Sequence, residues 1–232
     1  MPSQFSPALL LACFFTAAAS TPLPDEPPAR IAVHPPLPEP LSRGRVVIPY
    51  RTENVHIAPE FGPAALAKSP RVGHLHVSVD GAPWVWAHLS GEPVILNGLP
   101  PGPHKVLLQV ENANHQLLDE AAVQFAVPDA QSGTPDQHVR NDPRAKLTVD
   151  TPRAEPLSRG VVYLEYRTEP RLGTIQVTVD DLPLSWEDSS GGPVIILGLT
   201  AGKHRLRLQS TNAGPQETVE VTVPDVKRSQ HQ

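Results

Sequence analysis

Short runs in which apolar and polar residues alternate recur along the chain and predict β-strands. The runs are rich in β-branched residues, and proline or glycine separates them before a helical pattern can develop. Alternation with a period of two places one face of a strand in a core and the other face outside it. The pattern therefore predicts an all-β protein. In the first half of the chain the predicted strands are Arg45–Tyr50, His74–Asp80, Trp84–His88, Val94–Leu96, His104–Glu111 and Ala122–Val127.

The same pattern occurs twice along the sequence. EPLSRGRVVIPYRTE at residues 39–53 matches EPLSRGVVYLEYRTE at residues 155–169. The segments HVSVDGAPWVW, GEPVILNGLPPGPHKVLLQ and VQFAVPD have counterparts in the same order, which indicates a duplicated folding unit. Six or seven short strands in each unit predict two tandem immunoglobulin-like β-sandwich modules joined by a polar linker, with a small barrel as the alternative for each module.

The repeat also defines domain boundaries. The first copy contains a segment without a counterpart, NVHIAPEFGPAALAKS at residues 54–69, and insertions of this kind typically form loops. The segment between the copies is polar and has no hydrophobic period, as expected of a linker. We expect a signal peptide at residues 1–20, a proline-rich segment at 21–38, the first module at 39–128, the linker at 129–147, the second module at 148–225 and a tail at 226–232.

The strand at residues 74–80 begins with two histidines on the face opposite its apolar residues. His74 and His76 are two positions apart, so their side chains lie on one side, roughly 7 Å from each other. Two imidazoles at that spacing can bind one ion through bonds of about 2 Å. Antiparallel pairing of strands 74–80 and 104–111 brings His115, in the segment NANHQ, beside them. The pattern thus predicts a metal site formed by His74, His76 and His115.

The second copy offers an internal comparison for these histidines. It has Thr174, Gln176 and Pro215 at the three positions. Joint loss is expected if the histidines serve one site that the second copy lacks, but independent substitution of exposed residues would leave the same pattern. Solvated surface histidines therefore remain the alternative interpretation. Imidazole and carboxylate donors without thiolates favour Zn(II) or Cu(II) over Cu(I), with His88 as a candidate fourth ligand.

Other residues singled out by the pattern suit structural roles. His104 has a counterpart in His204 and lies on the core side of its strand, at the end away from the predicted site. This retention predicts a buried hydrogen bond near the turns PPGPH and TAGKH. Trp84, Trp86 and Trp186 are predicted to pack in the core.

The N-terminal segment MPSQFSPALLLACFFTAAAST predicts export. Its apolar stretch is too short to span a bilayer and is followed by small residues, as in a secretory signal, so we expect a periplasmic or secreted protein without a membrane span. LLAC at residues 10–13 resembles a lipobox, but the apolar run continues beyond Cys13, which disfavours a lipoprotein. Since Cys13 is the only cysteine, the mature chain would contain no disulfide.

Charge and motifs exclude several classes of function. The net charge is −5 and neither half has a basic excess, so a nucleic-acid partner is not expected. The sequence contains no G-x-S-x-G or H-E-x-x-H motif, and its carboxylates follow no pattern that would place two in one cleft. We therefore expect no enzymatic activity and no catalytic residues.

Several segments carry a resemblance to known sequences. LPEPLSRGRVVIPYRTEN, FGPAALAKSPRVGHLHVSVDGAPWVWAHLSGEPVILNGLPPGPHKVLLQVENANH and VQFAVP resemble a family of uncharacterised bacterial secreted proteins, a domain of unknown function. The order G-H-x-H, P-G-x-H and N-H is also similar to a second uncharacterised exported family. The resemblance covers about residues 33–128, and residues 148–225 share the scaffold but differ at the three histidine positions. It implies an exported, compact β fold and no particular activity.

The leading hypothesis is an exported, non-enzymatic binding protein. Its first module would bind a small ligand, a divalent metal ion, through His74, His76 and His115. The alternative is a structural or adhesive interaction protein without a metal site, whose tandem sandwiches present sheet edges or loops to a protein partner. In that case the insertion at residues 54–69, with Phe61, would form the contact surface.

Overall fold

A computed structural model describes residues 27–129, 146–150, 153–154, 161–169, 174–210 and 214–225. The predicted signal peptide, Cys13, most of the predicted linker and the C-terminal tail lie outside these residues. The first copy contains β1 (Arg30–Val33), α1 (Pro38–Leu41), β2 (Val46–Ile48), β3 (Tyr50–Glu53), β4 (His56–Ile57), α2 (Gly62–Lys68), β5 (Val72–Val79), β6 (Val85–His88), β7 (Val94–Asn97), β8 (Gly102–Asn112) and β9 (Leu117–Val127). The second copy contains β10 (Lys146–Val149), β11 (Arg153–Ala154), β12 (Val162–Leu164), β13 (Tyr166–Glu169), β14 (Ile175–Val179), β15 (Ser185–Asp188), β16 (Val194–Leu197), β17 (Gly202–Ser210) and β18 (Gln216–Val223).

The strands of each copy divide between two large sheets and one two-stranded sheet, in immunoglobulin-like order. In the first copy β6, β5, β8 and β9 are neighbours in one sheet, whereas β2 pairs with β7 and β1 with β3. In the second copy β15, β14, β17 and β18 are neighbours, while β12 pairs with β16 and β10 with β13. If β2 and β3 are counted as one strand and β4 of the insertion is left out, β5, β6, β8 and β9 are the third, fourth, sixth and seventh strands of the first copy. These four strands share one sheet, as in immunoglobulin-like sandwiches. The predicted all-β sandwich is confirmed, and the barrel alternative is wrong.

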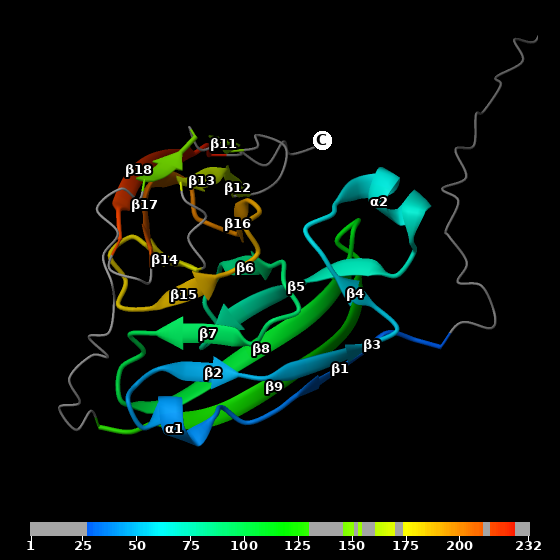
Figure 1. Cartoon of the computed structure of the whole chain (residues 1–232), viewed down its shortest axis with the longest axis horizontal. Coiled ribbons are helices and arrows are strands. Elements are labelled where there is room, and N and C mark those ends of the chain that lie inside the picture. The colour runs from blue at the N-terminus through cyan, green and yellow to red at the C-terminus, as the bar shows by residue number, and fades with distance from the viewer. Residues whose placement is uncertain are drawn as a thin grey trace, which may run out of the picture.

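The two copies share both sheets. β6 pairs with β16 and β7 pairs with β15, so each copy adds strands to the other (Figure 1). The results are an eight-stranded sheet, β11-β12-β16-β6-β5-β8-β9 with β4 beside β5, and a six-stranded sheet, β18-β17-β14-β15-β7-β2. Trp86 lies opposite Ile196, and Trp186 lies opposite Leu96, at equivalent positions of the repeat. The copies are therefore related by an approximate two-fold axis and are joined by strand pairing as well as by the chain between them.

A shared core lies at this junction. The rings of Trp86 and Trp186 stack with centroids 4.8 Å apart, and Trp84 lies 6.1 Å from Trp186. Trp86 and Trp186 are almost completely buried. The predicted core role of the tryptophans is confirmed, but the core that they fill belongs to both copies.

Gly98 and Gly198 permit the close approach of the copies. Both have positive φ, and a Cβ atom would lie 1.9 Å from the Pro183 carbonyl oxygen at Gly98 and 2.6 Å from the Pro83 carbonyl oxygen at Gly198. A side chain at either position would displace backbone of the other copy. The lack of a side chain at Gly98, after β7, and at Gly198, after β16, thus allows the two copies to pack against each other.

The insertion at residues 54–69 is more than a loop. It contributes β4, which runs parallel to β5, and α2, whose residues Pro63 to Lys68 combine a proline in the first turn with alanine and leucine. The apolar side of α2 packs on Val72 and Ala113 through Ala65 and Leu66. Figure 1 shows α2 on the side of β5 opposite to β1 and β3. The insertion therefore covers the part of the outer face of the eight-stranded sheet that lies at the start of β5 and the end of β8.

Two further features complete the fold. β1 lies in the segment expected to precede the first module, and its pairing with β3 extends that module toward the N-terminus. Within the described residues, neither helix has the length and apolar character needed to cross a membrane.

Candidate metal centre

The structure brings three histidines and one glutamate together on the outer face of the eight-stranded sheet. His74 and His76 lie on β5, Glu111 lies on β8 directly opposite His74, and His115 follows β8 in a tight turn. The antiparallel pairing predicted for these two strands is confirmed. One ligand atom from each of the four residues lies within 4.8 Å of the others. We call His74, His76, Glu111 and His115 the histidine cluster.

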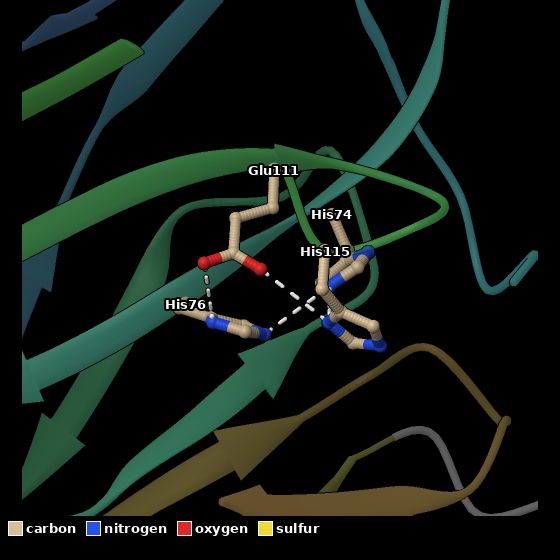
Figure 2. Close-up of side chains that lie close together, drawn as sticks. All are labelled: His74, His76, Glu111 and His115. Atoms are coloured by element: carbon tan, nitrogen blue, oxygen red, sulfur yellow. Dashed lines mark hydrogen bonds and ion pairs between the residues drawn. The ribbon is translucent and has the colours of Figure 1, made fainter. Parts of the chain in front are cut away.

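The side chains of the cluster point toward a common centre (Figure 2). His74 Nε2 lies 3.2 Å from His76 Nε2 and 3.2 Å from His115 Nδ1. Glu111 Oε1 lies 3.0 Å from His76 Nδ1, and Glu111 Oε2 lies 3.4 Å from His115 Nδ1. Four donor atoms of metal-ligand type thus form a continuous series of short contacts, from His76 through His74 and His115 to Glu111.

These contacts cannot all be hydrogen bonds. His76 Nδ1 donates its proton to the Glu111 carboxylate, which leaves a lone pair on His76 Nε2. His74 and His115 can each direct at most one proton into the series, whereas the series contains three contacts. At least one contact therefore joins two groups of the same kind, either two lone pairs or two N–H groups, which repel each other. A cation at the centre, bound by four deprotonated atoms, would remove that repulsion.

Burial agrees with this interpretation. His74 is completely buried and His76 is 6% exposed, although both lie on the face that the alternation assigned to the outside. The structure contradicts the solvated surface histidines of the alternative interpretation at these two positions. Phe61 of the insertion packs on His74, and His115 and Glu111 lie against His76. Among the described residues, His74 Nδ1 and Glu111 Oε2 are two of the three buried side-chain atoms without a hydrogen-bond partner. His115 is the accessible member, with 43% of its side chain exposed.

The protonation states suit a cation. Burial, followed by the neighbouring His76 and His115, lowers the pKa of His74 to about 3, so this imidazole is neutral. Burial alone would raise the pKa of Glu111, but the neighbouring imidazoles of His115 and His76 hold it at about 2. A neutral imidazole and an ionised carboxylate are the forms that bind metal ions.

Asn112 holds the turn that carries His115. Its side-chain oxygen accepts hydrogen bonds from the backbone N–H groups of Asn114 and Gln116, and its side-chain nitrogen donates to the Gln116 side chain. His115 donates its backbone N–H to the Asn112 carbonyl and has a φ of 59°. The turn therefore fixes the one ligand that lies outside a strand.

His88 is not part of the cluster, and its candidacy as a fourth ligand is wrong. It lies opposite Leu75 in the pairing of β5 and β6 and so projects to the inner side of the sheet. Its Nε2 lies 2.9 Å from the Glu92 carbonyl oxygen and must donate to it. Because that nitrogen carries a proton, it cannot act as a base toward Ser90, whose Oγ lies 3.4 Å away.

The structural role predicted for His104 and His204 is confirmed. His104 lies between the Asp80 carboxylate at 2.7 Å and the Pro100 carbonyl at 2.7 Å. His204 makes the same contacts with Asp180 at 2.6 Å and Thr200 at 2.8 Å. Both partners of each imidazole are acceptors, so both ring nitrogens donate and the ring carries a positive charge.

Glu111 is the residue that the sequence analysis missed. The sequence did contain a signal for it. If β5 and β8 pair antiparallel so that His115 lies near the start of β5, one residue at the end of β8 must lie directly opposite His74. Identifying that residue requires the register between β5 and β8, which is regular and places Glu111 opposite His74. The only register shift of β8 is in its pairing with β9, between Val110 and Glu111. The predicted assignment of His74, His76 and His115 as metal ligands remains a prediction, to which the geometry adds Glu111.

Comparison with known proteins gives a family. Residues 11–138 and 169–232 match DUF6130, a family of unknown function. The chain belongs to this family. The DUF6130 match includes residues of both copies and all members of the histidine cluster, but the family supplies no activity. No curated protein matches the chain.

Solved structures with similar β modules have low similarity scores. The fibronectin(III)-like modules of Clostridium thermocellum CbhA have a TM-score of 0.27 and 9% sequence identity, with 82% of this chain and 92% of that chain covered. The central fibronectin-III array of RIM-binding protein has a TM-score of 0.27 and 13% identity, with 85% of this chain and 69% of that chain covered. Neither similarity bears on the histidine cluster.

Proposed function

We propose that the chain is a non-enzymatic binding protein that holds one divalent metal ion in the histidine cluster. The observation that supports this most strongly is the series of three contacts among His76, His74, His115 and Glu111, for which at most two protons are available. A divalent cation accepts all four lone pairs and neutralises the buried carboxylate. The ligands would be His74 Nε2, His76 Nε2, His115 Nδ1 and Glu111 Oε2.

The three contacts of the series are closer to the ligand spacing of a tetrahedral ion than to that of a square-planar ion, and this favours Zn(II) over Cu(II). A tetrahedral ion with bonds of about 2.0–2.1 Å has ligand atoms about 3.3 Å apart. A square-planar Cu(II) site with similar bonds would place adjacent ligands about 2.9 Å apart. The three contacts in the cluster are 3.2, 3.2 and 3.4 Å long. We therefore propose Zn(II), with Cu(II) as the competing ion.

Glu111 would have two tasks in this site. Its Oε1 accepts the proton of His76 Nδ1, which orients that imidazole with Nε2 toward the ion. Its Oε2 has no hydrogen-bond partner and faces His115 Nδ1, so it is available as the fourth ligand. One carboxylate would thus both bind the ion and position another ligand.

Calorimetric titration of the metal-free mature chain with Zn(II) tests the proposal. We expect one ion per chain. A variant that carries the second copy's residues at the three positions, His74→Thr, His76→Gln and His115→Pro, should bind none. His56→Ala is the matched control, because His56 is an exposed histidine of the insertion outside the cluster. Equal binding by the triple variant and the unchanged chain would contradict the proposal.

The setting of the proposed function is export. The N-terminal segment that predicts a secretory signal supports binding in the periplasm or outside the cell. Mass spectrometry of the protein recovered from the periplasm or medium of a bacterial host tests this. We expect the N-terminal 20 residues to be absent. Recovery of the full-length chain in the cytoplasmic fraction alone would contradict it.

A structural or interaction role is the second candidate function. Leu117 and Leu118, at the start of β9 beside His115, are 52% and 38% exposed, and exposed apolar residues are common in contact surfaces. Under this candidate the mature chain binds no stoichiometric Zn(II), and the substitutions Leu117→Ser and Leu118→Ser reduce its association with a partner. The zinc titration therefore distinguishes the two candidates.

A further inference from the structure

The junction between the copies presents two outer faces of different character. On the eight-stranded sheet an apolar patch combines residues of both copies, and we call it the outer patch: Ala87, Leu89, Val161, Tyr163, Ile195 and Leu197. The equivalent positions on the six-stranded sheet are Glu187, Ser189, Arg45, Val47, Ile95 and Asn97. The two-fold relation between the copies makes each face a natural comparison for the other.

The face on the six-stranded sheet is polar at its centre. Arg45 Nε and Nη2 donate to the two carboxylate oxygens of Glu187 at 3.1 and 2.9 Å, and Asn97 Nδ2 donates to Glu187 Oε1 at 3.0 Å. On the eight-stranded sheet the same three positions are occupied by the apolar residues Val161, Ala87 and Leu197. Their burial requires a segment that covers this face. The insertion, present only in the first copy, supplies it.

Phe61 of the insertion connects the outer patch with the histidine cluster. It packs against the outer patch, and its ring centroid lies 4.9 Å from that of His74 and 6.0 Å from that of His115. The residue after it, Gly62, donates its backbone N–H to the Ala113 carbonyl, in the turn that carries His115. One aromatic ring therefore contacts the proposed ligands and packs on a patch to which both copies contribute. Pro59 of the insertion also lies beside the second copy, since a Cβ atom at Gly192 would be 3.4 Å from the Pro59 Cβ atom.

We propose that Phe61 closes the metal site and that the second copy, which lacks the histidines, holds Phe61 in its closed position. This inference rests on the proposed function, because it assigns the cover to the same site. It explains why a cover, a histidine cluster and an apolar patch occur together on one face and are all missing on the other. Phe61 would limit the access of water and competing ligands to the ion from the side of the insertion.

Two variants test this cover, and one control matches them. Phe61→Ala removes the ring, and Leu197→Asn places in the outer patch the residue that the other face has at that position. Asn97→Leu is the reverse exchange on the uncovered face. In the metal-free protein, modification of His74 by diethyl pyrocarbonate, followed by mass spectrometry, measures exposure of the site. In the zinc-loaded protein, transfer of the ion to an excess of chelator measures its release rate.

We expect both Phe61→Ala and Leu197→Asn to increase His74 modification and zinc release at least about tenfold. Asn97→Leu should change neither. Unchanged His74 modification in Phe61→Ala would overturn the cover, whether or not zinc binds. Increased modification in a chain that binds no zinc would retain the cover and overturn the proposed function instead. An effect of Phe61→Ala without any effect of Leu197→Asn would overturn the role of the second copy.

Discussion

At the scale of single residues, His74 and the pair formed by His104 and His204 represent two kinds of buried histidine with opposite electrostatic requirements. His74 is surrounded by other imidazoles, and its pKa is lowered. His104 and His204 each lie between a carboxylate and a carbonyl. Burial alone would lower the pKa of these two histidines, but the hydrogen bonds to Asp80 and Asp180 and to the turn carbonyls raise it above 6.5. The first kind suits a cation, and the second kind is itself a cation.

The raised pKa values predict how His104 and His204 contribute to stability. The folded state binds a proton on each more tightly than the unfolded state, so their contribution is complete below about pH 6.5 and decreases as pH rises through the folded-state pKa. Replacing Asp80 and Asp180 by asparagine should lower the melting temperature at pH 6 more than at pH 9. Thermal unfolding of both proteins at the two pH values measures this. A difference in melting temperature that is independent of pH would contradict the charged state assigned to these histidines.

Glu111 gives a second prediction at this scale. In Glu111→Gln the side-chain oxygen can still accept the proton of His76 Nδ1, but an amide nitrogen replaces the ligand oxygen. We expect Zn(II) affinity to decrease by at least about 10-fold, as measured by competition with a chelator. Glu120→Gln, at an exposed position of β9, is the control and should bind as the unchanged chain does. Equal affinities of the two variants would remove Glu111 from the ligand set.

At the scale of elements, the turn after β8 determines whether His115 reaches the other ligands. Asn112→Ala removes three hydrogen bonds within the turn and leaves backbone N–H groups without their partner. We expect a loss of about 1–3 kcal/mol in the free energy of unfolding and weaker zinc binding. Asn112→Asp keeps the accepting oxygen and should lose less. Asn114→Ala, at an exposed position of the same turn, should have no effect on zinc binding.

The elements also show what the sequence could predict. Alternation identified β5 and β8, because one face of each is apolar, and the strand order of a sandwich predicted their pairing. The insertion was predicted as a loop because its short helix, α2, is stabilised mainly by packing on Val72 and Ala113. Burial of His74 and His76 could not be predicted from alternation, because alternation within one strand does not show which other segments pack on its outer face, as Phe61 packs on His74.

At the scale of the whole molecule, the duplicated units form one structure. The repeat predicted two tandem modules, but β6 pairs with β16 and β7 pairs with β15, so strands of the two copies form continuous sheets. Such pairing has no local sequence pattern. It places Trp86 of one copy on Trp186 of the other, so neither copy completes its core alone.

The shared core predicts a single unfolding transition. Trp186→Ala should lower the free energy of unfolding by about 3–5 kcal/mol. In this variant the remaining tryptophans, Trp84 and Trp86, both belong to the first copy, so fluorescence reports on the first copy and circular dichroism on the whole chain. We expect both signals to change at the same, lowered temperature. Leu182→Ala, at an exposed position, is the control. If the fluorescence transition stayed at the temperature of the unchanged chain while the circular dichroism signal changed at a lower temperature, the copies would unfold independently, and the prediction would be wrong.

The proposed metal site is tested most directly by locating the ion. A crystal of the mature chain grown with Zn(II), with diffraction data collected on both sides of the zinc absorption edge, shows where zinc lies. The account predicts one anomalous peak per chain, about 2.0–2.2 Å from His74 Nε2, His76 Nε2, His115 Nδ1 and Glu111 Oε2. A map with no peak among these four atoms, from a crystal that contains zinc elsewhere or none at all, would contradict it.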